Sequence, residues 1–128
     1  HTQSPAANAD GWNNSNVTVT FTCSDALSGV ASCTGPQTIS TEGKAQGVTG
    51  TVTDNAGNTA SDPAQVSIDK TKPVITVDAL PAPNANGWYG DDVTATYTAS
   101  DNLSGVSDQD HAHTFGEGAA QTHTATAT

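Results

Sequence analysis

The chain has 128 residues, a length that allows one medium-sized domain or two small ones. Its 13 acidic residues outnumber 3 basic ones, so it lacks the clustered Lys and Arg needed to bind nucleic-acid phosphates or anionic lipid surfaces. Hydrophobic residues make up only 34% of the chain and no apolar run is long enough for membrane insertion, while abundant Thr and Val favour thin β-structure over helix.

Strands of alternating polarity are predicted along the chain. In Val17–Cys23, apolar side chains alternate with threonines, which is the period-2 pattern of a strand with one buried face. Val48–Thr53 and Gln65–Ile68 are predicted as later strands, and Pro73–Val77 as the next one. Clusters of Gly, Asn, Asp, Ser and Pro between them are typical of turns. Short strands with frequent turns predict an antiparallel β-sandwich.

The chain also contains an internal repeat. Three pairs of segments align, the first two at a distance of 76 residues and the third after a one-residue deletion: Pro5–Trp12 with Pro81–Trp88, Val17–Val30 with Val93–Val106, and Thr41–Thr53 with Gly116–Thr128. Chance similarity between Thr-rich segments would not keep Trp, Gly, Asp and a Leu-Ser-Gly-Val run in common register. We therefore predict two tandem modules, residues 1–69 and 74–128, joined by a short linker, residues 70–73, that a proline stiffens.

Three segments resemble a family of bacterial immunoglobulin-like repeats, similar to hyalin-type repeats: Ser24–Val30, Thr53–Asn58 and Asp69–Pro73. The resemblance covers essentially the whole chain and implies an all-β fold of two tandem Ig-like antiparallel β-sandwich modules. Such repeats form arrays on surface proteins, adhesins and secreted enzymes. The resemblance thus implies a non-catalytic structural or adhesive module of an extracellular or cell-surface protein, acting as stalk, spacer or filament subunit. The alternative is a carbohydrate-binding accessory module of a secreted enzyme.

The repeat frame is shifted relative to the chain. A strand matching Val74–Val77 should precede Pro5, where only His1–Ser4 stand, and the second module stops at Thr128 before its expected last strand. We therefore expect the first module to lack its first strand and the second module its last. Either the chain is a piece of a longer array, or neighbouring repeats or identical subunits complete the modules by β-strand addition.

The two cysteines, Cys23 and Cys33, lie on either side of a loop that turns back, so a local disulfide is sterically reasonable. The alternative is a pair of free buried thiols. A disulfide would stabilise a small core and fits an oxidising, extracellular compartment. The second module has Ala99 and Gln109 at the matching positions, so the fold does not depend on the bridge.

Acidic and amide side chains gather in the predicted turns, where their oxygens suit Ca²⁺. The candidate calcium ligands are Asp25, Asp54, Asn55, Asn58, Asp69 and Asp101. The alternative is structural, because Asp and Asn also cap turns by accepting bonds from nearby backbone N–H groups. The spacing does not match an EF-hand.

Two aromatic and three imidazole side chains are further candidates. Trp12 and Trp88 follow a glycine ahead of the alternating strand, where an exposed indole could contact a glycan and a buried one would close the end of the sandwich. His111, His113 and His123 could hold Zn²⁺ or Cu²⁺, or be ordinary surface histidines, since the first module lacks them. The partners we expect are neighbouring repeats, a surface glycan, or a host or cell-surface protein.

Overall fold

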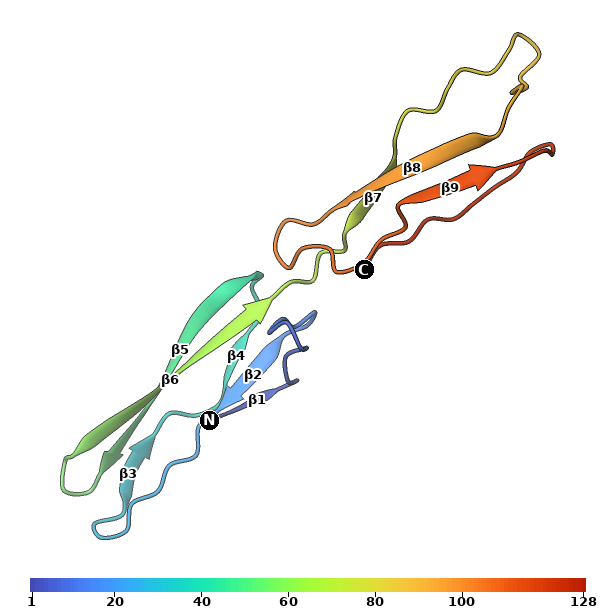
Figure 1. Ribbon diagram of the computed structural model, residues 1–128. Coiled ribbons are helices and arrows are strands. Elements are labelled where there is room, and N and C mark those ends of the chain that lie inside the picture. Colours follow the sequence, from blue (N-terminus) through green and yellow to red (C-terminus); the bar gives the residue numbers. More distant parts are fainter. The chain divides into compact units, whose positions relative to one another are not determined.

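The computed structural model describes the whole chain, His1–Thr128, which is all-β and divides into two compact units (Figure 1). Unit 1 is His1–Thr71 and unit 2 is Lys72–Thr128, so the division falls inside the segment 70–73 predicted as a linker. The strands are β1 (Thr2–Ser4), β2 (Val17–Thr20), β3 (Val30–Cys33), β4 (Gln37–Ile39), β5 (Gly43–Asp54), β6 (Thr59–Ile68), β7 (Val74–Val77), β8 (Val93–Ser100) and β9 (Ala112–Phe115). No element is a helix with the length and hydropathy that crossing a membrane requires.

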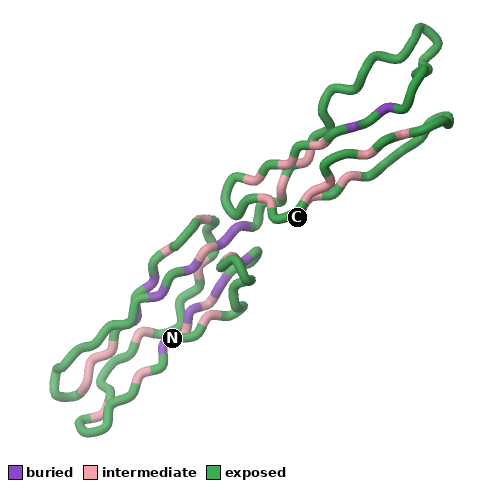
Figure 2. The backbone as a smooth tube through the Cα atoms, in the orientation of Figure 1, coloured by how far each residue is buried: buried purple, intermediate pink, exposed green.

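Unit 1 consists of two three-stranded antiparallel sheets, β1-β2-β4 and β3-β5-β6, that enclose one core. Alternation along β2 buries Val17 and Val19, and alternation along β6 buries Val66 and Ile68. Figure 2 colours the backbone by burial and shows more buried positions in unit 1 than in unit 2. The core is completed by side chains from neighbouring segments, namely Phe21, Ile39, Val48 and Ala64. This arrangement is the two-layer packing of a β-sandwich.

The long hairpin β5–β6 provides one face of this core. Its strands pair from Thr53↔Thr59 to Gly43↔Ile68, and a bulge between Gly43 and Gln46 bends β5 near the end of the pairing. β6 is the edge strand of its sheet and contributes three core side chains. It closes the sandwich on one side, next to β1, which is the edge strand of the other sheet.

Unit 1 begins with a short strand, since β1 pairs with β2 in the register Gln3↔Val19. In the 76-residue repeat β1 aligns with Asp78–Leu80, just after β7, so the absence of a strand matching Val74–Val77 stays a prediction. Unit 2 uses the same register where β7 pairs with β8, at Val77↔Tyr97, once the 76-residue repeat is taken into account. The polar segment of β1 escaped the sequence analysis because antiparallel pairing uses backbone groups, which need no alternation of apolar side chains.

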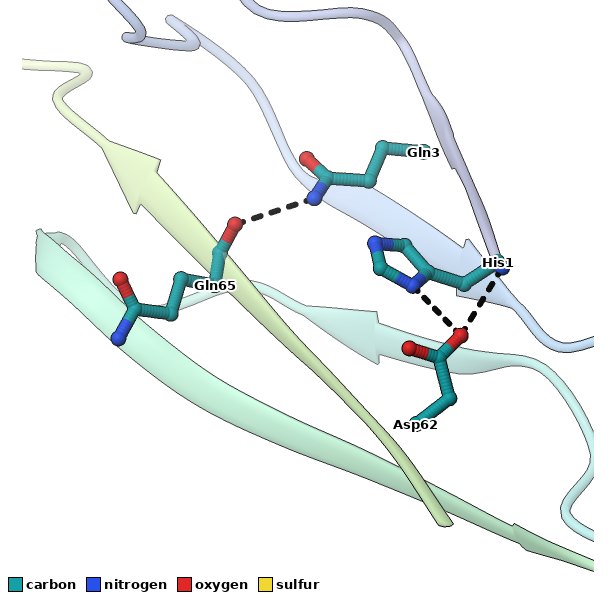
Figure 3. Close-up of polar contacts among 4 residues, drawn as sticks. All are labelled: His1, Gln3, Asp62 and Gln65. Carbon is teal, nitrogen blue, oxygen red and sulfur yellow. Dashed lines mark hydrogen bonds and ion pairs between the residues drawn. The ribbon is translucent and has the colours of Figure 1, made fainter.

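Gln3 of β1 and the preceding residue His1 also reach the opposite sheet (Figure 3). Gln3 Nε2 donates to the carbonyl oxygen of Gln65 at 3.0 Å. The amino group and Nδ1 of His1 both approach Asp62 Oδ2, at 3.1 and 2.8 Å. These bonds connect β1 with β6, at the seam where the edges of the two sheets meet.

Unit 2 contains one sheet, β7-β8-β9, and a much smaller buried core. Only Val93 and Ala95 are buried hydrophobic residues there. The segment that matches β5, Gly118–Thr128, forms no strand and makes one isolated bridge, Gln109↔Ala127. In unit 1 the matching segment, β5, pairs with β6, which supplies three core side chains.

A glycine in β5 makes room for the aromatic ring of the core, and this allows a test. A Cβ at Gly50 would clash with the aromatic ring of Phe21, whereas a Cβ at Gly47 would meet nothing within 4 Å. We therefore expect Gly50→Ala to lower the free energy of unfolding by about 1–3 kcal/mol through overpacking. Urea denaturation followed by circular dichroism measures the loss, with Gly47→Ala as a matched control on the same strand. Equal stability of the two variants would contradict this packing.

Candidate functional site

Asp25 and Asp101 cap the same turn in the two units. Asp25 Oδ1 accepts the backbone N–H of Gly29 at 2.7 Å and that of Leu27 at 3.1 Å. Asp101 Oδ1 accepts from Gly105 at 3.0 Å and from the intervening Leu at 2.9 Å. Each turn closes on a glycine in the left-handed region, with φ near 80°. Both carboxylates thus have a structural role that accounts for their position in the repeat.

Asp54 caps a second turn in unit 1. Its Oδ1 accepts from the backbone N–H groups of Ala56 and Asn58, at 2.9 and 2.8 Å, and Asn58 Nδ2 donates to its Oδ2 at 2.8 Å. The bond from the Asn58 side chain, followed by the one from its backbone, lowers the pKa of Asp54 from the usual 3.8. Asn55 Nδ2 donates to the carbonyl oxygen of Ser28 at 2.7 Å, so this turn docks on the turn that Asp25 caps.

The Asp54 bonds predict a pH dependence. A carboxylate whose pKa is lower when folded stabilises the fold fully above the unfolded pKa of about 3.8, and this stabilisation is lost as the pH falls through the folded value. We expect NMR titration of the Asp54 carboxyl carbon to give a midpoint below 3.8. Asn58→Ala should move that midpoint upward; an unchanged midpoint would contradict the assigned cause.

The structure does not gather the candidate calcium ligands into a single cluster of carboxylates. No group of three or more His, Cys, Asp or Glu side chains is arranged to hold a metal ion. Asp69 is buried, and its Oδ1 accepts the backbone N–H of Thr71 at 3.1 Å. A calcium site that combines one carboxylate with amide and backbone oxygens stays a prediction.

The histidines of unit 2 stack instead of converging. The rings of His113 and His123 are nearly parallel, 3° apart, with centroids separated by 4.0 Å. Because ring-nitrogen lone pairs lie in the plane of an imidazole, stacked rings do not direct two nitrogens at one ion. His111 Nδ1 lies 3.2 Å from Gln109 Nε2.

The disulfide predicted between Cys23 and Cys33 is present, with a Cα–Cα separation of 6.1 Å. It joins the segment that follows β2 to the end of β3. Since β2 and β3 belong to different sheets of unit 1, the disulfide links the two layers. In unit 2 the matching positions are joined by a hydrogen bond, because Ala99 N donates to Gln109 Oε1 at 2.9 Å. The sequence analysis identified both positions but missed this substitute contact, since only the folded loop brings the amide side chain to the backbone.

The two tryptophans occupy different surroundings. Trp12 is partly buried, whereas Trp88 is 55% exposed. Trp88 lines a groove of about 1200 Å³ in unit 2 that the sequence analysis did not predict. The groove lies between the segment Gly87–Val93 and the segment Phe115–Gln121. It combines apolar side chains with carboxylates and is a candidate binding site.

The fold and the bridge define an all-β protein with one disulfide. No protein-family model, curated protein or solved structure matches the chain.

Proposed function

We propose that the chain is part of a tandem array of Ig-like repeats, a non-catalytic structural or adhesive module of an extracellular or cell-surface protein that acts as stalk, spacer or filament subunit. The observation that carries this proposal is the reuse of one turn geometry in both units, at Asp25 and Asp101. Polar side chains that cap equivalent turns in both modules stabilise the fold, which fits a structural role. The disulfide supports an oxidising compartment.

The acidic composition supports the same proposal. A formal net charge of −10 keeps neighbouring modules soluble and makes their surfaces repel each other. Thr-rich strands and backbone pairing supply structure without any catalytic group. The role of such an array is then to span a distance.

Small-angle X-ray scattering of polypeptides with one, two and four copies of the 76-residue period tests this role. A spacer predicts that the maximum dimension grows by a similar increment with each added copy. A maximum dimension that barely changes with copy number would show a collapsed array and would overturn the proposal. The test does not depend on any ligand.

Exposure of Trp88 favours a second candidate, a carbohydrate-binding accessory module of a secreted enzyme. An exposed indole beside Tyr89 can stack on a sugar ring while nearby carboxylates accept hydrogen bonds from the sugar hydroxyls. A glycan array followed by calorimetry would identify the sugar, and Trp88→Ala should abolish binding while Trp12→Ala leaves it unchanged. Absence of binding across the array, or equal loss in both variants, would remove this candidate.

A further inference from the structure

The segment that leaves unit 1 is held by hydrogen bonds beyond the end of β6. Asp69 N donates to the carbonyl oxygen of Asn13 at 2.8 Å, and Asp69 Oδ1 accepts the backbone N–H of Thr71 at 3.1 Å. Asp69 is buried, and it directly follows Ile68, a core residue with 0% exposure. The fixed part of unit 1 therefore continues past its last strand.

The side chain of Lys70 fastens the same segment to two other parts of unit 1. Its Nζ donates to Asn16 Oδ1 at 2.7 Å and to the carbonyl oxygen of Ser40. Asn16 directly precedes β2, whereas Ser40 directly follows β4. Because β2 and β4 are neighbours in one sheet and β6 belongs to the other, the lysine links the exit segment to the opposite layer.

The carboxylate of Glu42 holds the exit segment at a third place. Its Oε1 accepts the backbone N–H of Lys70 at 2.6 Å and the hydroxyl of Thr71 at 3.1 Å. Hydrogen bonds to an ionised acceptor are stronger than those between neutral groups. The loop that carries Glu42 is itself braced, because Gln46 Nε2 donates to the carbonyl oxygen of Thr41 at 2.8 Å. The carboxylate is thus positioned to hold its partners with little further ordering cost.

These bonds end at Thr71, which is also the last residue of unit 1. Strand pairing in unit 2 begins at Val74, opposite Ser100. Only Lys72 and Pro73 lie between these points. Proline fixes its own φ and restricts the residue before it to extended conformations. Few backbone torsions are therefore free to change between the last bond of unit 1 and the first strand of unit 2.

We propose that residues 69–71 form an exit clasp, which fastens the end of unit 1, confines the joint of the chain to Lys72 and Pro73, and shields the linker from proteases. The clasp assigns the first half of the linker predicted from sequence, residues 70–73, to unit 1. Its use as a joint in an array rests on the proposed function, whereas the clasp itself does not. Without it, residues 70–73 would all be free to move.

Trypsin, which cleaves after lysine but not before proline, provides a direct test. The bond after Lys72 precedes Pro73, so Lys70–Thr71 is the bond of the linker that trypsin can cut. Lys70 is exposed, and the bond is therefore protected only as far as the clasp holds the backbone in place. We expect Glu42→Ala to speed cleavage at this bond by about tenfold and to yield the fragments 1–70 and 71–128.

Two variants and an internal reference sharpen this test. Glu117→Ala is the matched control, since Glu117 stands at the position of Glu42 in the repeat, and it should leave the cleavage rate unchanged. Asn16→Ala removes an acceptor of the ammonium group from an exposed position and should also speed cleavage. Cleavage after Lys44, in β5, reports on the stability of unit 1 as a whole.

Two outcomes of the trypsin experiment contradict the clasp. Equal rates at Lys70–Thr71 in the wild-type chain and in both clasp variants would overturn it. Parallel acceleration after Lys44 and after Lys70 would overturn it as well, because Glu42 and Asn16 would then stabilise the whole of unit 1 and not its exit.

Backbone ¹⁵N relaxation measures the clasp without a protease. Order parameters at Lys70 and Thr71 are expected near 0.85, as in rigid backbone, and should fall below about 0.6 in the double variant Glu42→Ala and Asn16→Ala. Values already below about 0.6 in the wild-type chain would overturn the proposal. The scattering test of array length is separate: a collapsed array with an intact clasp contradicts the spacer alone, and an extended array without protection at Lys70 contradicts the clasp alone.

Discussion

Replacing Ile68 with alanine is expected to lower the free energy of unfolding of unit 1 by about 2–5 kcal/mol. Ile68 is fully buried, at 0% exposure, among core residues of both sheets. It is also the last residue of β6, where the strand pairs with Gly43 and bridges to Asn13. The truncation therefore removes core contacts at the point where three segments meet, so little relaxation can fill the cavity.

Trp12 provides a local probe for this experiment. In a Trp88→Phe background, urea denaturation followed by tryptophan fluorescence reports on unit 1 alone. Val74→Ala, at a β7 residue that is 60% exposed, is the control and should change stability far less. A loss below about 1 kcal/mol for Ile68→Ala would show that β6 does not close the core.

In unit 1, β5 pairs with β6, which supplies three core side chains. The alternation of Gln65–Ile68 predicted β6 from sequence. The absence of a strand in Gly118–Thr128 was not predictable, since a strand assignment depends on a partner and not on the segment's own pattern. The same alternation thus yields a strand in β5 and a single bridge in unit 2.

Other elements escaped the sequence analysis because their side chains carry no burial pattern. All four residues of β3 are exposed, and β4 has only Ile39 partly covered. Their pairing with β5 and β2 is a property of the backbone. Features that depend on residues close in sequence could be predicted. Residue type and spacing indicated the disulfide, and they gave Asp-capped turns as the alternative to a calcium site.

The groove is the part of the candidate site that sequence could not provide. Trp88 was selected as an aromatic residue at a turn, but its companions lie about thirty residues away, in Phe115–Gln121. Only the folded positions of the two loops bring these residues together around one groove.

Removing the disulfide with the double substitution Cys23→Ala and Cys33→Ala is expected to lower the free energy of unfolding of unit 1 by about 2.5–3 kcal/mol. The bridge closes a short loop, with a sequence separation of 10 residues, and so restricts the unfolded chain. It also fastens β3, which buries none of its own side chains and relies on pairing with β5. We therefore expect the loss to include faster hydrogen exchange in Val30–Cys33.

Unit 2 supplies a matched comparison for this loop. Gln109→Ala removes the hydrogen bond that replaces the bridge, and it should cost only about 0.5–1.5 kcal/mol. Urea denaturation of both variants and of the reduced wild-type chain measures the free energy of unfolding that the disulfide and the hydrogen bond each contribute. If the double substitution and reduction both left stability and exchange in β3 unchanged, the pairing of β3 with β5 alone would hold that end of the sandwich. A loss of the expected size instead shows that the covalent link compensates for a strand without a buried face.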